Sequence, residues 1–303
     1  MAPNPYLRRL GFADTDRVVI LHADDVGVSQ ASVVAFMELL DVGCVSSGAV
    51  MVPCAWFPTV AAYARRSPQV DIGVHLTLTS EWETARWGPV STRDPTSGLV
   101  DGAGYFYRTR RQVEEAADLD AVRLEVRAQV ARAVAAGIDV THVDTHMFTL
   151  MHWKFLGAYR QVAREYRVPL FMTHLRRDSL RERGMEAATV AALERMVADR
   201  AAAGLPTFDH VDLLPLAEAD NRLELTKARL AAVPPGLTHF IIHPSLDTPE
   251  ARALSPDWPA RVADYQTFMS RELRDFVRDQ GLHVIGYRAI RDAMRRPPEA
   301  PGV

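Results

Sequence analysis

The 303-residue chain has few cysteines, no long apolar run and little excess charge of either sign. Its two cysteines, Cys44 and Cys54, are too few for a disulfide framework; they could pair, but two buried free thiols are favoured. No stretch of about 18 apolar residues occurs, so no membrane span is expected. With 35 basic and 38 acidic residues, the net charge of −3 indicates no surface for nucleic acid. The first residues lack the apolar core of a signal peptide, so we expect a cytoplasmic protein.

Glycine-rich nucleotide-binding loops are also missing. No G-x-G-x-x-G follows the first predicted strand, and no G-x-x-x-x-G-K-[ST] occurs anywhere in the sequence. The chain contains no internal repeat and no low-complexity linker. Both common nucleotide-binding interpretations therefore lose support.

Apolar, strand-like segments alternate with helical patterns along nearly the whole chain. Strands are predicted at 18–27, 45–52, 70–79, 138–145, 169–174, 238–243 and 282–287, with 208–214 as a further short candidate. Helices are predicted at 29–41, 57–66, 119–136, 152–166, 217–232, 261–280 and 289–295. This alternation indicates an α/β fold with a mainly parallel sheet. It favours one irregular, TIM-barrel-like (β/α) domain over residues 1–303 instead of an open doubly wound sheet.

Two segments depart from this alternation. Residues 80–118 contain several aromatic residues, prolines and glycines but no persistent period, which predicts a long irregular loop. Its aromatic content argues against disorder. Residues 176–205 are rich in arginine and alanine and are predicted to form a mostly exposed helical excursion, or part of a contact with a partner. A homodimer is left open.

The strand at 18–27 ends in two adjacent carboxylates, Asp24 and Asp25, followed closely by Gly27. Ionised carboxylates at the edge of an apolar core are costly unless a cation compensates them. Neighbouring residues of a strand point to opposite sides, so we assign one aspartate as a metal ligand and the other as a proton acceptor. The alternative is an aspartate pair that caps the helix beginning near Ser29. On this stretch alone, the two interpretations are equally favoured.

Residues that commonly bind metals recur at the ends of other predicted strands: His75, then Asp144 and His146, then His243. The carboxyl ends of parallel strands are where sites assemble in α/β folds. One carboxylate and two imidazoles leave a coordination position open for water, which is the pattern of a catalytic metal site. Zinc suits these nitrogen and oxygen ligands best, while magnesium, manganese and cobalt stay open.

Four motifs in the same order resemble those of the YdjC-like carbohydrate deacetylases: His-Ala-Asp-Asp-Val-Gly at 22–27, Gly-Val-His-Leu-Thr-Leu-Thr at 73–79, Thr-His-Val-Asp-Thr-His at 141–146, and His-Pro at 243–244. The resemblance extends to Gly-Tyr-Arg at 286–288. It implies an irregular (β/α) barrel, one divalent metal ion (zinc or magnesium), and removal of acetyl groups from N-acetylated sugars such as chito-oligosaccharides.

The same resemblance implies roles for individual residues. Asp25, His75 and His146 match the metal ligands, and Asp24 matches the general base. His243 matches a histidine that acts at the leaving group or at the oxyanion. In such a mechanism a metal-activated water attacks the amide, Asp24 takes its proton, and His243 is the candidate donor to the leaving amine.

Departures from the family pattern bear on the substrate. The family often has Asn where His22 stands and Phe where Val26 stands, and it usually has more histidines where residues 147–149 read Met-Phe-Thr. Two other functions therefore stay open: hydrolysis of another amide or ester, and sugar binding without turnover. The complete ligand and base set argues against a pure binding protein.

Some side chains carry two interpretations. Trp82 and Trp87 could stack on a sugar ring or, equally, pack in the core. Arg288 could bind an acidic substrate group or pair with a nearby aspartate. We expect Asp144 to orient a ligand histidine and His142 to pack in the core.

Overall fold

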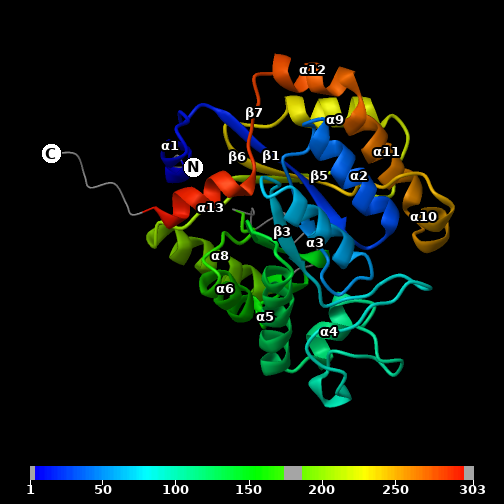
Figure 1. Ribbon diagram of the computed structural model, residues 1–303. Coiled ribbons are helices and arrows are strands. Elements are labelled where there is room, and N and C mark those ends of the chain that lie inside the picture. Colours follow the sequence, from blue (N-terminus) through cyan, green and yellow to red (C-terminus); the bar gives the residue numbers. More distant parts are fainter. Residues whose placement is uncertain (1–3, 174–185, 297–303) are drawn as a thin grey trace.

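A parallel β-sheet forms the centre of the computed structural model, which describes residues 4–173 and 186–296 (Figure 1). Its strands are β1 (Arg17–Val26), β2 (Ser47–Val50), β3 (Ile72–Leu76), β4 (Val143–Thr145), β5 (His210–Leu213), β6 (Gly236–Ile242) and β7 (His283–Val284). The order is β4-β3-β2-β1-β6-β5, with β7 beside the first half of β1, and every pairing is parallel. The predicted α/β class with a parallel sheet is confirmed.

Short bridges connect the two edges of this sheet. Val143 of β4 pairs with Leu170, and Thr173 pairs with Phe208 just before β5. The main chain adds hydrogen bonds from Phe171 N to Val143 O at 2.9 Å and from Phe208 N to Met172 O at 2.7 Å. The sheet therefore curls into the expected irregular barrel, with isolated bridges where a regular barrel has a full strand. The last residue of the predicted strand 169–174 lies outside the described residues.

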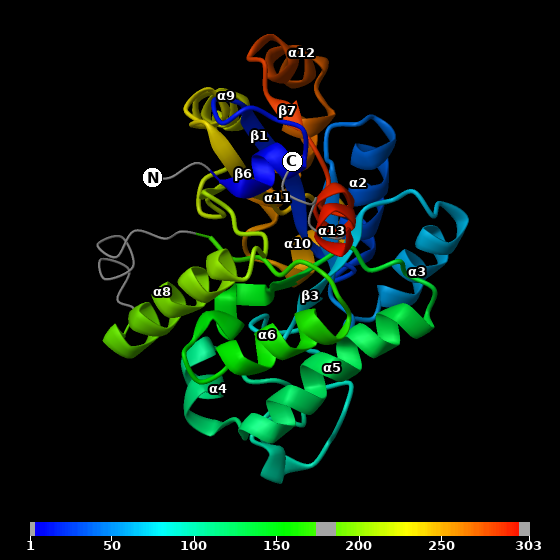
Figure 2. The same ribbon diagram turned by 90° about the vertical axis from the view of Figure 1, so that its left-hand side faces the viewer.

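Helices surround the curled sheet in both views (Figures 1 and 2). They are α1 (Pro5–Arg9), α2 (Gln30–Asp41), α3 (Phe57–Arg66), α4 (Arg110–Ala116), α5 (Leu119–Ala135), α6 (Leu156–Glu165), α8 (Ala187–Ala202), α9 (Arg222–Ala231), α10 (Pro249–Leu254), α11 (Trp258–Met269), α12 (Arg271–Asp279) and α13 (Tyr287–Arg295), with 3-10 turns η1 (Pro95–Ser97) and η2 (His146–Met151). Across residues 4–173 and 186–296, none of these helices is long and apolar enough to cross a membrane.

Several predicted boundaries differ from the structure. The predicted helix 261–280 is two helices, because the Ser270 side chain accepts a hydrogen bond from Leu273 N and starts α12 as a new helix. The predicted last strand, 282–287, shrinks to two residues, since α13 begins at Tyr287. Of the predicted helical excursion, residues 176–185 lie outside the described residues, and α8 forms most of the rest.

The segment at 80–118 is less irregular than predicted. It contains η1, α4 and an antiparallel bridge between Val100 and Phe106. Three of its aromatic residues, Trp82, Trp87 and Phe106, are buried, and Trp87 Nε1 donates to Thr79 O at 2.7 Å, whereas Tyr105 is exposed. Figures 1 and 2 place α4 at the end of the molecule opposite α12. The segment is therefore an ordered extension of the barrel.

Close packing fixes α2 against the sheet. Helix α2 begins at its cap Ser29, and its side chain Phe36 is fully buried over Gly48 of β2. A Cβ atom added at Gly48 would lie 2.4 Å from Phe36 Cε2 and 3.0 Å from Ala23 O. Only glycine fits here without moving the aromatic ring or the neighbouring strand β1.

We expect Gly48→Ala to lower the free energy of unfolding by about 1–3 kcal/mol, because the added methyl overpacks the core. Gly102→Ala is the matched control, since nothing lies within 4 Å of its added Cβ, and it should change stability by less than about 0.5 kcal/mol. Urea denaturation measures both variants. Equal losses would show that Gly48 is not under steric constraint.

Candidate active site

The end of β1 brings two aspartates to the same side of the barrel. Asp25 has a left-handed backbone with φ of +58°, a conformation that aspartate tolerates better than most residues. The pairing of β1 with β2 shifts register between Ala23 and Val26. As a result, Asp24 and Asp25 both line one cavity of about 960 Å³. The interpretation of this pair as a helix cap is wrong, since Ser29 caps α2.

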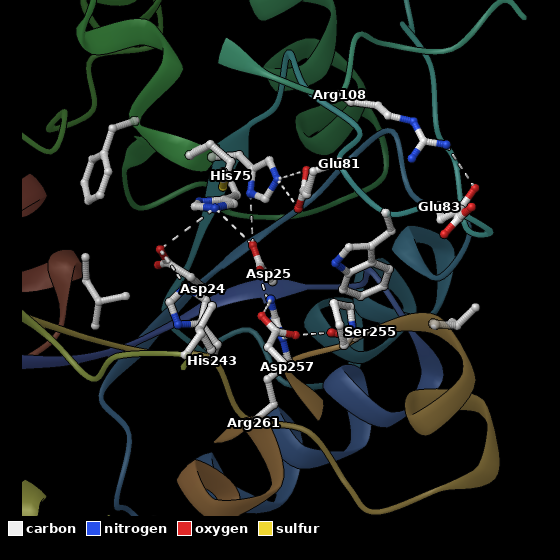
Figure 3. Close-up of a pocket in the computed structure, with 18 of the residues that line it drawn as sticks. Asp24, Asp25, His75, Glu81, Glu83, Arg108, His243, Ser255, Asp257 and Arg261 are labelled. Carbon is white, nitrogen blue, oxygen red and sulfur yellow. Dashed lines mark hydrogen bonds and ion pairs between the residues drawn. The ribbon is translucent and has the colours of Figure 1, made fainter. Parts of the chain in front are cut away.

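Two histidines from neighbouring strands meet Asp25 (Figure 3). His75, from β3, places Nε2 3.3 Å from Asp25 Oδ1. His146, which follows β4, places Nδ1 3.1 Å from the same oxygen. All three residues are buried and line the cavity. The structure thus brings together the residues predicted as ligands, because β1, β3 and β4 are parallel and end at the same rim of the barrel.

The outward nitrogen of each histidine already has an acidic partner. His75 Nδ1 lies 2.8 Å from Asp144 Oδ1, and His146 Nε2 lies 3.0 Å from both oxygens of Glu81. One potential ligand atom from each of Asp25, His75 and His146 lies within 4.8 Å of those of the other two residues. Asp25 Oδ1 is buried without a hydrogen-bond partner among the described residues. Histidines oriented by carboxylates around an unpaired carboxylate oxygen fit a divalent metal ion with open coordination positions.

The charge of this cluster is also suited to a cation. Burial lowers the pKa of His146, but the carboxylates of Glu81 and Asp25 outweigh burial and raise the pKa to about 9. Burial likewise lowers the pKa of His75, and Asp144 and Asp24 raise it well above its usual value. Both shifts arise because acidic groups crowd the two rings, an environment that also favours a metal ion.

Three other buried groups of histidine and aspartate in the described part of the chain have ligand-like spacing. They involve His22, His142, His239, Asp24, Asp144 and His75. His22 Nε2 lies 2.8 Å from His142 Nε2, so these two rings satisfy each other. His22, His142 and His239 are 0–1% exposed and lie within the barrel interior. Among these groups, the one formed by Asp25, His75 and His146 has every member on the cavity wall.

Arg261 compensates the second oxygen of Asp25. Its NH1 lies 2.8 Å from Asp25 Oδ2, and its guanidinium also bonds Asp257 at 2.8 and 3.1 Å. Burial by itself raises the pKa of Asp25, but Arg261 and His146 outweigh burial and hold the pKa well below its usual range. Figure 3 shows Asp25 between His75 and Arg261. The ion pair between Arg261 and Asp25 occupies Oδ2, so Oδ1 is the oxygen that faces the two histidines.

Asp24 lies beside this cluster with one oxygen bonded and one facing the cavity. Oδ1 lies 2.8 Å from His22 Nδ1, whereas Oδ2 lies 3.9 Å from both His75 Nε2 and His243 Nε2. Burial by itself raises the pKa of Asp24, but His75 and His22 outweigh it and hold the pKa below its usual value. Asp24 is therefore an ionised carboxylate that can accept a proton at Oδ2.

His243 directly follows β6, and its ring lies next to Asp24. Its main-chain N–H donates to Asp264 Oδ2 at 2.9 Å, and Arg222 holds the other oxygen of Asp264 at 2.7 Å. The ring lines the cavity, and burial lowers its pKa. The buried pair beneath it thus fixes the backbone of His243, while the imidazole stays available to the cavity.

The two tryptophans were predicted either to contact the substrate or to pack in the core, and they differ in position. Trp82 lines the cavity, although only 7% of its surface is exposed. Trp87 is buried behind it, with the two ring centroids 5.8 Å apart in an edge-to-face arrangement. Trp87 is therefore a core residue, and Trp82 forms part of the cavity wall.

Arg288 does not line the cavity, so the prediction that it contacts the substrate is wrong. Its guanidinium pairs with Asp139 and donates to the carbonyl oxygen of Val70 at 2.7 Å. Val70 precedes the start of β3, at the end of the barrel opposite His75. The structure confirms the alternative prediction, in which Arg288 pairs with a nearby aspartate.

Sequence reasoning missed Glu81 and Arg261. Glu81 lies in the segment without a period, six residues beyond His75, and no pattern signals its contact with His146. Arg261 and Asp257 have the i,i+4 spacing of an ordinary helical ion pair. The contact of Arg261 with Asp25 joins residues 236 positions apart, which the sequence alone does not reveal. The cavity wall contributed by residues 252–257 was missed for the same reason.

Comparisons with known proteins give the family and the fold. A family model described as YdjC-like protein matches residues 18–279. A carbohydrate deacetylase of Thermus thermophilus is 34% identical over 289 residues, which cover 95% of this chain and 98% of that protein. One of Thermoanaerobacter pseudethanolicus is 22% identical over 275 residues, covering 91% of this chain and 100% of that protein. A crystal structure from Enterococcus faecalis V583 has a TM-score of 0.71 at 24% identity, covering 91% of this chain and 99% of that one, and supports the fold alone.

We expect Arg261→Met to lower the free energy of unfolding of the metal-free protein by about 3–5 kcal/mol, because it leaves Asp25 as a buried charge without its cation. Arg271→Met is the matched control, since Arg271 is exposed and 3.6 Å from Asp275, and its loss should be about 0–1 kcal/mol. Urea denaturation in the presence of a chelator measures both. A similar small loss for the two variants would contradict the assigned compensation of Asp25.

Proposed function

The chain belongs to the YdjC-like family, and on that basis we propose that it is a metal-dependent carbohydrate deacetylase. It would remove the acetyl group from an N-acetylated sugar, such as a chito-oligosaccharide. The observation that carries the proposal is the convergence of Asp25, His75 and His146 on one cavity wall, with the ionised Asp24 alongside. Relatives named carbohydrate deacetylase span nearly the whole chain and support the same activity.

Asp25, His75 and His146 are the proposed metal ligands, for zinc or magnesium. A divalent metal ion in such a site lowers the pKa of a bound water and polarises the carbonyl of the amide. Asp144 and Glu81 hold the two imidazoles in the orientation that turns one nitrogen of each toward Asp25 Oδ1. Arg261 holds Asp25 by its other oxygen, which keeps Oδ1 directed at the same point.

Asp24 is the proposed general base. Its Oδ2 faces the cavity, and its low pKa keeps it ionised and able to take a proton from the attacking water. His22 occupies Oδ1, so the carboxylate presents one defined oxygen. A base so close to the ligand cluster has no use in a protein that only binds sugars.

His243 is the proposed donor to the leaving nitrogen. Burial lowers its pKa, so the ring begins the reaction neutral and must receive a proton before it can donate one. Asp24 Oδ2 lies 3.9 Å from His243 Nε2 and gains a proton when the water attacks. We therefore propose that His243 takes this proton from Asp24 and passes it to the departing amine.

The cavity is large enough for a sugar of more than one ring. Its volume of about 960 Å³ is at the upper end of the usual range for small-molecule sites. Trp82 supplies an aromatic surface suited to the apolar face of a pyranose, while Glu83 and Arg108 supply polar groups at the same wall. Met147 and Phe148 add apolar surface, which is the observation that keeps hydrolysis of another amide or ester as the second candidate.

We expect Asp24→Asn to retain the bound metal and to lower turnover by about 10²–10⁴-fold, because the amide cannot accept the proton of the water. Asp120→Asn, an exposed aspartate of α5, is the control and should keep full activity. Metal analysis after dialysis and acetate release from acetylated chitobiose are the two measurements. Loss of metal together with activity would instead make Asp24 a ligand.

An acetate-release screen across N-acetylated mono- and disaccharides tests the substrate class. We expect acetate from at least one of them, and we expect chelation of the metal to abolish it. Bound metal with no acetate from any acetylated sugar would favour the second candidate. Absence of metal from the purified protein, together with failure to bind added zinc or magnesium, would favour a sugar-binding relative without turnover.

A further inference from the structure

A continuous line of hydrogen bonds runs from Asp24 through the barrel interior to Asp71. Asp24 Oδ1 lies 2.8 Å from His22 Nδ1, and His22 Nε2 lies 2.8 Å from His142 Nε2. His142 Nδ1 is 3.0 Å from Thr141 Oγ1, which is 2.6 Å from Asp71 Oδ1. Asp71 precedes β3, so the line begins at the cavity and ends at the amino ends of the strands. We call these five residues the interior chain.

The fold leaves the middle of this chain no freedom to rearrange. His22, Thr141 and His142 are fully buried. Tyr287 stacks on the ring of His142 with centroids 3.6 Å apart and an interplanar angle of 10°. On its other side, a Cβ atom added at Gly73 would lie 2.4 Å from His142 Cε1. A glycine in β3 therefore makes room for this imidazole.

Each of the four contacts needs one hydrogen, so no member of the interior chain can turn without breaking a buried hydrogen bond. Thr141 Oγ1 donates to Asp71 Oδ1, and Thr141 Oγ1 can also accept from His142 Nδ1. His142 Nε2 and His22 Nε2 share one hydrogen, which leaves His22 Nδ1 to meet Asp24 Oδ1.

Asp71 anchors the far end of the interior chain. Thr141 Oγ1 donates to Asp71 Oδ1 at 2.6 Å, Ser47 Oγ donates to the same oxygen at 2.9 Å, and the main-chain N–H of Arg288 donates to Oδ2 at 2.6 Å. These three donors hold the carboxyl group in place, so Thr141 has one fixed partner.

We propose that Asp71, Thr141, His142 and His22 are positioning residues for Asp24. Asp71 holds Thr141, Thr141 holds His142, and His142 holds the His22 ring with Nδ1 at Asp24 Oδ1, which leaves Oδ2 facing the cavity. This inference rests on the proposed role of Asp24 as the general base.

Nitrogen-15 NMR of the histidine rings tests the proposal without any substrate. In the full-length protein we expect His22 Nδ1 to carry the hydrogen of its contact with Asp24 Oδ1. Single substitutions, His22→Asn and His142→Gln, assign the two signals. A His22 ring protonated on Nε2 alone would overturn the proposal, whatever the activity of the protein.

Thr141→Val removes the hydroxyl link and keeps the shape of the side chain. We expect it to change the ring signals of His22 and His142 and to lower kcat on the order of 10- to 100-fold with little change in KM, because the base loses its fixed orientation. Thr141→Ser should restore both. Thr238→Val is the matched control: Thr238 is a buried residue of β6 whose Oγ1 has no hydrogen-bond partner among the described residues. Unchanged ring signals in Thr141→Val would contradict the proposal.

Asp71→Asn and Asp71→Leu test the far end of the interior chain. An amide oxygen can still accept from Thr141, so Asp71→Asn should keep most of kcat and the ring signals, whereas Asp71→Leu should change both. Unchanged kcat and ring signals in Asp71→Leu, in a protein that still folds and binds metal, would contradict the proposal. If no acetate is released by any variant or by the parent protein, the proposed function fails, while the ring signals still report on the interior chain.

Discussion

The structure depends on how the barrel tolerates two adjacent carboxylates at the end of its central strand. Asp24 and Asp25 are both largely removed from solvent, where an ionised carboxylate is stable only next to compensating charge or hydrogen-bond donors. The left-handed backbone at Asp25 turns both side chains to the same cavity. Each then takes a separate set of partners: Arg261 and two histidines for Asp25, and His22 for Asp24. This division gives the two neighbours different chemistry.

Parallel topology explains why the partners of these carboxylates come from distant parts of the sequence. Strands β1, β3, β4 and β6 all end at the same rim, so the residues at or just after their carboxyl ends face one cavity. The polar residues that hold them come mainly from the segments after the strands, such as Glu81 and the helix that carries Arg261. The site therefore combines a rigid set of strand ends with side chains from the connecting segments.

The interior of the barrel has a second polar layer below the cavity. His22, His142 and Thr141 fill space that apolar side chains fill in most barrels, and they are tolerated because each has a partner. Under the proposal above, this layer connects Asp71 to the orientation of Asp24. The stability of the core and the geometry of the base are then set by the same hydrogen bonds.

Much of the fold and part of the candidate site could be predicted from the sequence. The alternation of apolar strands and helices predicted the parallel barrel, and polar residues at strand ends indicated a metal site, because strand ends converge in such a fold. The resemblance to the YdjC-like family then assigned Asp25, His75 and His146 as the ligands. The same logic could not find Arg261 or Glu81, whose contacts depend on how α11 and the segment after β3 pack. It also misplaced Arg288, since a basic residue after a strand gives no sign of which neighbour it meets. The break between α11 and α12 was missed because the cap at Ser270 competes with a continuous helical pattern.

The central claim is that Asp25, His75 and His146 bind one divalent metal ion beside Asp24. Anomalous diffraction from crystals grown with zinc or manganese tests it most directly. The account predicts one strong anomalous peak bonded to Asp25 Oδ1, His75 Nε2 and His146 Nδ1. A peak among His22, His142 and Asp144, or no peak within bonding reach of Asp25 in metal-saturated crystals, would contradict it.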